Sequence, residues 1–304
     1  MALAQTGVVV EVIVVDNGSE PANADWLAQH IDPRAKLIIE PGRVGVSVAR
    51  NTGAQLASSE WIAFLDDDDF WASYKLRTQL DALASSPHAK WCISGTACVD
   101  ATMRLVFTTR MPAEGTRLDD EILQRNCVSM SDIVVRRDVM FDCGAFDSAL
   151  RQLEDWDFLV RLAITAPCPA VADRPLSLYR LNPGSVTDDA DQMRIAFTTF
   201  AARHEALRQE RGLQFDWRSP EFWLAFRISQ GGRGAEASVL FRESFDRSRD
   251  PRDLAYSYAS RWFNPVFVKA MSWLHVGKLP RAWRRDVREL LSDVKRQQDH
   301  GYAY

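Results

Sequence analysis

The 304-residue sequence contains no apolar run of about 18 residues, so nothing in it is typical of a transmembrane helix. Its first residues lack the basic segment and cleavage site of a secretory leader, so no signal peptide is expected. The five cysteines form no Cys-x-x-Cys pair, and none of the five histidines is paired at metal-ligand spacing. A disulfide framework or a zinc site is therefore not expected, and we predict a cytoplasmic protein whose cysteines are buried core residues.

Positive charge is scarce over most of the chain. The net charge is −4, but residues 1–190 alone carry −10, while residues 261–304 carry +5. An acidic surface repels phosphate backbones, so no nucleic-acid partner is expected for the first part.

The basic tail contains one segment with helical periodicity, "RAWRRDVRELLSDVKR" at 281–296. Its apolar residues fall on one stripe, with the arginines off it: Trp283, Val287, Leu290, Leu291 and Val294. Aromatic residues are interleaved with the basic residues of 261–304: Trp262, Phe263, Phe267, Trp273 and Trp283. Basic amphipathic helices with tryptophan commonly lie in the headgroup region, which predicts peripheral contact of this tail with the inner face of a membrane. The alternative is that the stripe packs on the rest of the chain and the arginines are solvated.

Strand-like and helix-like segments alternate through the first part of the chain. "VVVEVIVVD", "KLIIE", "EWIAFL" and "KWCISGTACVD" are typical of strands, and helical or turn segments separate them. The pattern predicts an α/β fold with a mainly parallel central sheet flanked by helices, over residues 1–190. No strand-like run follows, so residues 191–304 are predicted to form a helical C-terminal region.

Four adjacent aspartates occur in "WIAFLDDDDFW", residues 61–71. Acids at a helix start would explain one or two of them, because they accept backbone N–H bonds there. A divalent cation held together with a phosphorylated ligand would explain more, and we leave both alternatives open. Asp16 and Asp66 each close a predicted strand, and open α/β sheets bind ligands beyond the carboxyl ends of their strands.

A second acidic group occurs in "QLEDWDFLVRL", residues 152–162. It could simply begin a helix. Alternatively, a carboxylate beside an aromatic wall can gain a raised pKa and serve as a general base.

Taken in order, five groups of segments resemble family 2 glycosyltransferases: "EVIVVDNGS", "RVGVSVARNTG", "WIAFLDDDDFW", "SDIVVRRDVMFDCGAFDSAL" with "EDWDFLVRL", and "YRLNPGSVT". The resemblance covers about residues 1–190. It implies an inverting transferase of the A-type nucleotide-diphospho-sugar fold, acting in cell-surface polysaccharide or glycolipid synthesis. It also implies a nucleotide-diphospho-sugar donor and a glycan or lipid-linked acceptor.

The resemblance assigns a donor side to five residues. Asp16 would contact the nucleotide base, and Arg50 would lie on the nucleotide side of the cleft. Asp66 and Asp67 belong to the D-x-D segment, where Asp66 would face the ribose. Arg180 would belong to a loop that closes over the donor, together with Ser185.

The resemblance also assigns the chemistry. Asp68 would ligate Mg²⁺ or Mn²⁺ at the donor diphosphate, and Asp155 would be the catalytic base. Glu154 and Trp156 would lie on the acceptor side. Asp69 is then left to cap the next helix.

Two features depart from the family pattern. The first strand and its Pro-x-Tyr-Asn loop are absent, which would leave an unpaired place near the middle of the sheet. The closing loop has Asn182 near a position where the family often has histidine. A non-catalytic sugar-nucleotide or glycan-binding module is therefore kept as the alternative. A nucleotidyltransferase is disfavoured, because no Gly- and Arg-rich phosphate loop occurs near the N-terminus.

Overall fold

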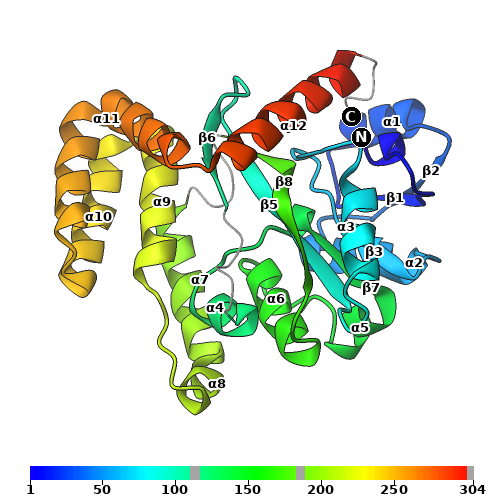
Figure 1. Ribbon diagram of the computed structural model, residues 1–304, viewed down its shortest axis with the longest axis horizontal. Coiled ribbons are helices and arrows are strands. Elements are labelled where there is room, and N and C mark those ends of the chain that lie inside the picture. The colour runs from blue at the N-terminus through cyan, green and yellow to red at the C-terminus, as the bar shows by residue number, and fades with distance from the viewer. Residues whose placement is uncertain (110–116, 183–188, 300–304) are drawn as a thin grey trace. The chain divides into compact units, whose positions relative to one another are not determined.

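The computed structural model describes residues 1–109, 117–182 and 189–299, and forms two compact units (Figure 1). The first unit combines residues 1–96, 128–178 and 286–304, and the second combines residues 97–127 and 179–285. Each unit is thus assembled from separate parts of the chain. A domain boundary near residue 190 stays a prediction.

The first unit is an α/β assembly whose strands belong to two sheets. The elements lying wholly in it are β1 (Val12–Asp16), α1 (Pro21–His30), β2 (Ala35–Ile39), α2 (Val46–Leu56), β3 (Trp61–Ala63), β4 (Phe70–Trp71), α3 (Lys75–Ala84), β7 (Ile133–Arg136), α5 (Arg137–Asp142) and α6 (Glu154–Thr165). Strands β5 (Trp91–Val99) and β8 (Ala170–Arg180) begin in this unit and end in the second.

The expected mainly parallel sheet is wrong. Strands β1 and β2 pair in parallel, but they form a separate two-stranded sheet. The larger sheet has the order β3-β7-β5-β8-β4, with β6 (Leu105–Thr108) also paired to β5. Its pairings β3–β7, β5–β7, β4–β8 and β5–β6 are all antiparallel, whereas β1–β2 is parallel, so the strands of this α/β fold are mixed in direction. In the described part of the chain β1 and β3 are not paired.

Strand β5 forms the core of the larger sheet. All nine of its residues are buried, as expected of a strand covered on both faces. The indole of Trp91 donates a 2.7 Å hydrogen bond to the carbonyl of Ala166, which satisfies its polar atom inside the core. Four of the five cysteines are buried and none forms a disulfide, as predicted, whereas Cys168 is exposed.

A buried polar network supports the strand that follows the aspartate run. Lys75 is fully buried, and its ammonium lies 4.3 Å from the ring centre of Trp71 and donates to Gln79. The Gln79 amide in turn donates to the carbonyl of Asp132 at 2.7 Å. The Asp132 carboxylate accepts hydrogen bonds from Thr96 and Ser177 on two neighbouring strands.

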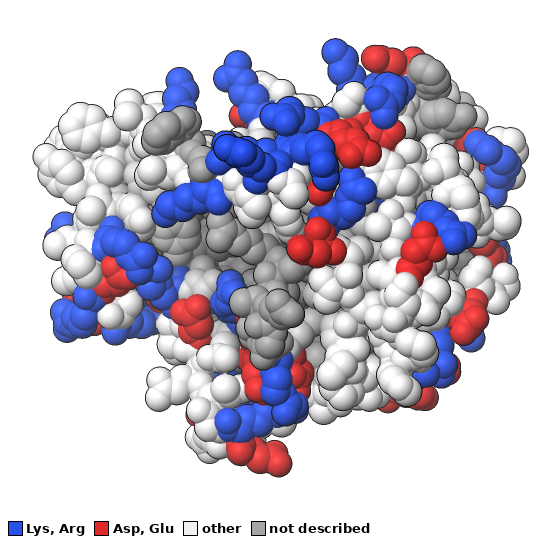
Figure 2. Space-filling view, in the orientation of Figure 1, with Lys and Arg blue, Asp and Glu red and all other residues white. Residues whose placement is uncertain are grey.

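Helix α12 (Arg281–Asp299) carries the apolar stripe that the sequence assigned to a membrane surface. Val287, Leu290 and Val294 are buried, and Gln297 donates to the backbone carbonyl of Trp71. The stripe is therefore core, as the alternative proposed, and membrane contact by the rest of the tail stays a prediction. Its basic residues are exposed, and Figure 2 shows Lys and Arg side chains over this helix.

The second unit is mainly helical. Besides β6 it contains α4 (Leu118–Gln124), α7 (Ala190–Arg203), α8 (Glu205–Glu210), α9 (Arg218–Gln230), α10 (Gly234–Ser248) and α11 (Pro251–Gly277). The predicted helical character of the region after residue 190 is thus confirmed. In the described part of the chain, no helix is both long and apolar enough to cross a membrane.

The buried lysine generates a prediction about stability. Burial lowers the pKa of Lys75 to about 7, from an ordinary value of 10.5, although the Asp132 charge raises it. Between these two values the unfolded chain holds a proton that the folded chain does not, so stability should rise with pH by about 1.4 kcal/mol per unit. Lys75→Met should remove this rise.

The measurement is urea unfolding at about pH 7.5 and pH 9. Between these values the free energy of unfolding of the native chain should rise by about 2 kcal/mol more than that of Lys75→Met. Lys36→Met, at an exposed lysine of β2, is the matched control and should keep the native response. An unchanged pH response in Lys75→Met would show that this lysine stays charged in the folded state.

Candidate active site

Arg50 on α2 is the positive centre around which the site's carboxylates gather. Its guanidinium donates to Asp66 at 2.8 Å and to Glu154 at 3.1 Å, from segments 16 and 104 residues away in sequence. The Arg50 and Glu154 side chains are each 12% exposed. The Asp155 charge also raises the pKa of Arg50, so four charges interact in one place.

An aromatic floor positions Arg50. Its guanidinium carbon lies 5.3 Å from the ring centre of Phe146, which stacks on Phe158 and meets Phe64 edge to face. The amide of Asn51 donates to the carbonyl of Phe146 at 2.8 Å and accepts from its N–H at 3.0 Å. Helix α2 is thus fastened to the loop after α5, and the Arg50 charge lies against an apolar ring, which strengthens its interactions.

The four aspartates form a turn after β3, and its members differ in exposure. Asp69 is buried, whereas Asp67 is exposed and Asp66 and Asp68 are intermediate. The Asp69 N–H donates to the Asp66 carbonyl at 3.0 Å, which closes the turn. The hydroxyl of Ser131 donates to the Asp69 carboxylate at 2.6 Å and accepts from the Asp66 N–H at 3.4 Å.

Asp69 therefore does not cap the next helix, since α3 begins at Lys75 and Tyr74 precedes it. Burial and then the Asp66 charge raise the pKa of Asp69 well above its ordinary value. The two aromatic residues after the run, Phe70 and Trp71, form β4 and pair with β8. The run thus turns the chain from one strand of the larger sheet into another.

Helix α6 begins at the acidic group, and its three acids have different partners. Glu154 bonds Arg50, and Asp157 is fully buried and accepts from Arg161 at 2.9 Å. Asp155 lies in the first turn, where its carboxylate accepts from the Trp156 N–H at 2.7 Å. Leu153 before the helix has φ of 58°, a left-handed conformation that aims this first turn.

Burial raises the pKa of two acids in the first turn of α6, Glu154 and Asp155. For Glu154, burial and then the Asp155 charge raise the pKa to about 7, while Arg50 lowers it. For Asp155, burial raises the pKa and Arg50 again acts against the rise. Perturbed acids of this kind are common where proton transfer occurs, although structural ion pairs shift pKa values too.

Asp16 closes β1 and is 6% exposed. Its Oδ1 accepts from the Ser19 hydroxyl at 2.5 Å and from the Ser19 N–H at 3.2 Å. Its Oδ2 is buried without a hydrogen-bond partner in the described part of the chain. A buried acceptor with no donor is costly, so this oxygen is suited to an N–H group of a ligand.

The loop after β1 approaches the loop before α2 very closely. A Cβ on Gly18 would lie 2.3 Å from the carbonyl carbon of Gly42, and the φ of Gly18 is +73°. The Asn17 side chain accepts from the Gly45 N–H at 3.0 Å, just before α2 begins. These contacts hold the Asp16 end of β1 against the start of the helix that carries Arg50.

The carboxylates of this site suit a hard cation only in part. The described residues contain no group of three or more His, Cys, Asp or Glu that could hold a metal by itself. Mg²⁺ and Mn²⁺ in phosphate-binding sites commonly take one or two carboxylates and complete their shell with phosphate and water. Asp66 and Asp68 on the turn fit that requirement, and they do not fit a closed protein cage.

The structure brings some of the residues predicted from the sequence together and buries another in the core. Arg50, Asp66, Glu154 and Asp155 come together in the first unit. Trp156 is fully buried, so its side chain belongs to the core and does not offer a surface to an acceptor.

The predicted closing loop is only partly described. Arg180 ends β8 and belongs to the second unit, so its role at the donor stays a prediction. Asn182 accepts a 2.9 Å hydrogen bond from Arg227 through its backbone carbonyl. Ser185 lies outside the described residues.

Two positioning residues were missed by sequence reasoning. Ser131 orients the aspartate turn, and Asp132 receives the bonds that link α3 to the sheet. Both lie in "SMSD", residues 129–132, a capping box in which Ser129 and Asp132 bond each other's backbone. A Ser-x-x-Asp segment before an apolar run was the available signal.

Comparison with known proteins gives the family. A family model described as "Glycosyl transferase family 2" matches residues 2–142. The chain is 33% identical over 308 residues to the "Succinoglycan biosynthesis protein ExoO" of Rhizobium meliloti, covering 94% of this chain and 82% of that protein.

Two further similarities are more limited. The chain is 36% identical over 81 residues to the Escherichia coli "UDP-Glc:alpha-D-GlcNAc-diphosphoundecaprenol beta-1,3-glucosyltransferase WfgD", covering 27% of this chain and 32% of that protein. Among solved structures, S. aureus TarS 1–349 "in complex with UDP" aligns with a TM-score of 0.46 and 16% identity, over 92% of this chain and 87% of that chain.

Removing the Arg50 guanidinium should lower the free energy of unfolding by a large amount that depends on pH. Arg50→Gln should lower the free energy of unfolding by about 2–3 kcal/mol at pH 8, because half-buried carboxylates lose their cation. The cost should be smaller at pH 5, since the pKa of Glu154 is about 7 and this acid is then protonated.

Denaturant unfolding at both pH values checks this. Arg34→Gln, which removes an exposed arginine from an ion pair with Asp32, is the control and should change little. Equal and small effects of the two substitutions would contradict a central electrostatic role for Arg50.

Proposed function

Because the chain belongs to glycosyltransferase family 2, we propose that it transfers a sugar from a UDP-sugar to an acceptor hydroxyl with inversion, in the synthesis of a cell-surface polysaccharide or glycolipid. The observation that carries the proposal is the convergence of Asp66, Glu154 and Asp155 on Arg50. The relatives add the substrate class: the name of WfgD specifies a UDP-glucose donor and a diphosphoundecaprenol-linked acceptor.

The donor end of the proposed site is the turn after β3 together with the end of β1. The unpaired buried Oδ2 of Asp16 would accept an N–H of the nucleotide base, and a uracil carries one such N–H between two carbonyls. Asp66 is already oriented by Arg50 and would face the ribose, with Asp67 beside it. The exposure of Asp67 leaves it accessible to a ligand.

A divalent cation fits this end of the site. Asp68, with Asp66 near it on the turn, would hold Mg²⁺ or Mn²⁺, which when bound supplies positive charge to the leaving diphosphate. The chain's own task is to keep the turn in place, which Ser131 and the Asp69 N–H accomplish through their hydrogen bonds.

The acceptor end would be the first turn of α6. In the transfer, the O–H bond of the acceptor breaks and its proton passes to Asp155 as the acceptor oxygen bonds the anomeric carbon. The bond from that carbon to the diphosphate breaks at the same time, and the nucleoside diphosphate leaves with its electron pair. Such proton transfer contributes on the order of 10²–10⁴ in rate.

Glu154 has a positioning role in this scheme. It anchors Arg50 to α6, and Arg50 in turn limits the rise in the pKa of Asp155. Arg50 therefore opposes the rise that burial causes in the pKa of the proposed base.

The donor proposal predicts metal-dependent nucleotide binding. Calorimetry should detect UDP binding with Mn²⁺ present, and chelation should weaken it by about tenfold or more, because the diphosphate loses its counter-charge. Asp68→Asn should reproduce the effect of chelation, while Asp81→Asn at an exposed position of α3 should not. GDP and dTDP serve as competing ligands, and UDP affinity that is the same with and without metal would remove the metal role of Asp68.

The base proposal predicts a defect confined to turnover. Asp155→Asn keeps the shape and the helix-start hydrogen bond, so UDP affinity should stay within about twofold, while kcat falls by about 10² or more. The assay requires UDP-sugars screened against a diphospholipid-linked glycan. An equal loss of donor affinity and of turnover would mean that Asp155 is structural.

A further inference from the structure

Helix α11 of the second unit turns several polar residues inward. Its fully buried residues recur with helical period and are polar: Asp253, Ser257 and Ser260. The half-buried Asn264 continues this side and donates to the Ser229 carbonyl of α9 at 2.8 Å. The buried side also holds Phe267 (5% exposed), whose ring contacts that of Phe241, so the inward side of α11 is mixed in character.

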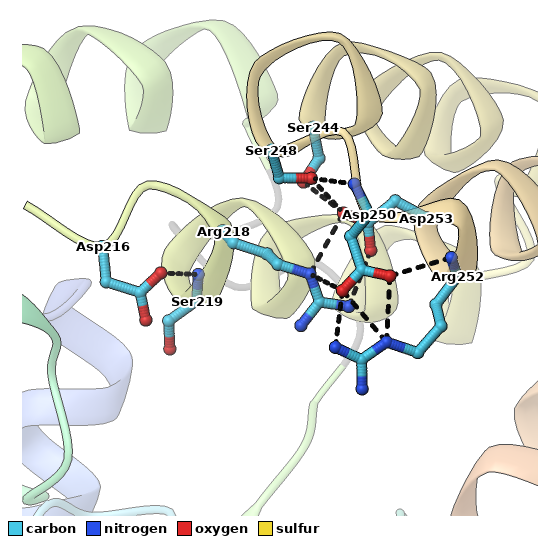
Figure 3. Close-up of polar contacts among 8 residues, drawn as sticks. All are labelled: Asp216, Arg218, Ser219, Ser244, Ser248, Asp250, Arg252 and Asp253. Atoms are coloured by element: carbon cyan, nitrogen blue, oxygen red, sulfur yellow. Dashed lines mark hydrogen bonds and ion pairs between the residues drawn. The ribbon is translucent and has the colours of Figure 1, made fainter.

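The polar side is matched by specific partners. At the start of the helix, Arg218, Ser244 and Ser248 all donate to the Asp253 carboxylate, at 2.8–3.1 Å (Figure 3). Further along, the Ser257 hydroxyl donates to the Ser238 carbonyl at 2.8 Å. A Cβ on Gly234 of α10 would lie 2.2 Å from the Ser260 carbonyl oxygen, so the two helices are in close contact. The inward orientation is therefore fixed by hydrogen bonds and tight packing.

The opposite side of α11 is apolar and exposed. It consists of Leu254 (43% exposed), Tyr258 (64%), Trp262 (64%), Phe263 (55%) and Val266 (65%). We call these five residues the α11 outer face. Single exposed apolar residues are common, but five within thirteen positions, three of them aromatic, indicate a contact surface. In Figure 2 the surface over α11, at the upper left, carries few charged side chains.

A kink shapes this face. Phe263 has φ of −131° and ψ of 33°, and Pro265 follows within the helix. A proline prevents the regular hydrogen bond to the preceding turn, so the helix bends there. The bend lies between Trp262 and Val266, in the middle of the outer face.

Two cations of α11 are exposed beside the outer face, Arg261 and Lys269. Arg252 is paired with Asp250 just before the helix, and the one acid of α11, Asp253, is fully buried and paired. The Arg261 guanidinium lies 5.7 Å from the Trp262 ring centre, which joins a cation to the apolar surface. Tryptophan, tyrosine and basic residues together are typical of helices that lie in an anionic headgroup layer.

We infer that the α11 outer face docks on an anionic lipid surface, with its aromatic side chains among the headgroups and Arg261 and Lys269 facing the lipid phosphates. Charge complementarity selects this partner. A second copy of the chain would bring the same cations against one another, which is unfavourable. The inference rests on the second unit alone and does not depend on the transferase chemistry.

The test is co-sedimentation of the full chain with phosphatidylcholine vesicles that contain phosphatidylglycerol. Binding is expected, and it should weaken with added salt and be much lower on pure phosphatidylcholine. Arg261→Gln with Lys269→Gln should reduce binding by roughly 30-fold, the combined effect of two cations at such a surface. Trp262→Ser, alone or with Phe263→Ser, should reduce it by about tenfold or more, because aromatic burial is lost.

Two matched control variants test whether the effect is specific to α11. Arg288→Gln with Lys295→Gln removes the same charge from exposed positions of α12, and Trp26→Ser removes a tryptophan that is 52% exposed on α1. Both should bind as the native chain does, with unchanged circular dichroism. The inference is overturned if the native chain stays in the supernatant, or if the α12 pair weakens binding as much as the α11 pair. It is also overturned if Trp262→Ser instead dissolves a dimer seen by sedimentation equilibrium.

Discussion

The requirement that gathered carboxylates be neutralised governs the first unit. Asp66, Glu154 and Asp155 all interact with Arg50, whose guanidinium lies over the ring of Phe146, and ionised acids are costly to bury. Arg50 offsets that cost from the centre, and its planar guanidinium can bond two acids at once. The helix, the aspartate turn and α6 therefore depend on one another for their positions.

A second polar network holds the aspartate turn in place through Ser131. Lys75 and Asp132 are both fully buried, and burial moves the pKa of Lys75 down to about 7 and that of Asp132 up to about 6. Hydrogen bonds from Thr96 and Ser177 join Asp132 to two strands, while Ser131 next to it holds the Asp69 carboxylate. Buried networks of this kind are costly unless fully satisfied, and they specify one arrangement when they are. The aspartate run is thus a structural turn at Asp69 and a candidate ligand surface at Asp66–Asp68.

Local patterns predicted the elements better than the sheet that they build. The β-branched run ending at Asp16 and the alternating segments gave β1, β2, α2 and β5, because periodicity reports local structure directly. The order of motifs also brought the "ARNTG", "DDDD" and "EDWD" segments to one site. Strand direction could not be read this way, since β3, β7 and β8 are joined by long connections whose pairing depends on the whole fold. Phe70 and Trp71 alone are too short a pattern to predict β4. The amphipathic stripe of α12 has the same sequence pattern whether it packs on the core or lies on a membrane.

The two units differ in what they offer a ligand or partner. The first gathers charged side chains around Arg50, and the second exposes an apolar side of α11. The central claim, that the Arg50-centred carboxylates form a nucleotide-sugar site, is tested most directly by a crystal structure of the chain with UDP and Mn²⁺. The account predicts an anomalous manganese peak within ligand distance of Asp68, and a uracil N–H bonded to Asp16 Oδ2. Manganese bound away from the aspartate turn, or a nucleotide bound away from β1, would contradict it.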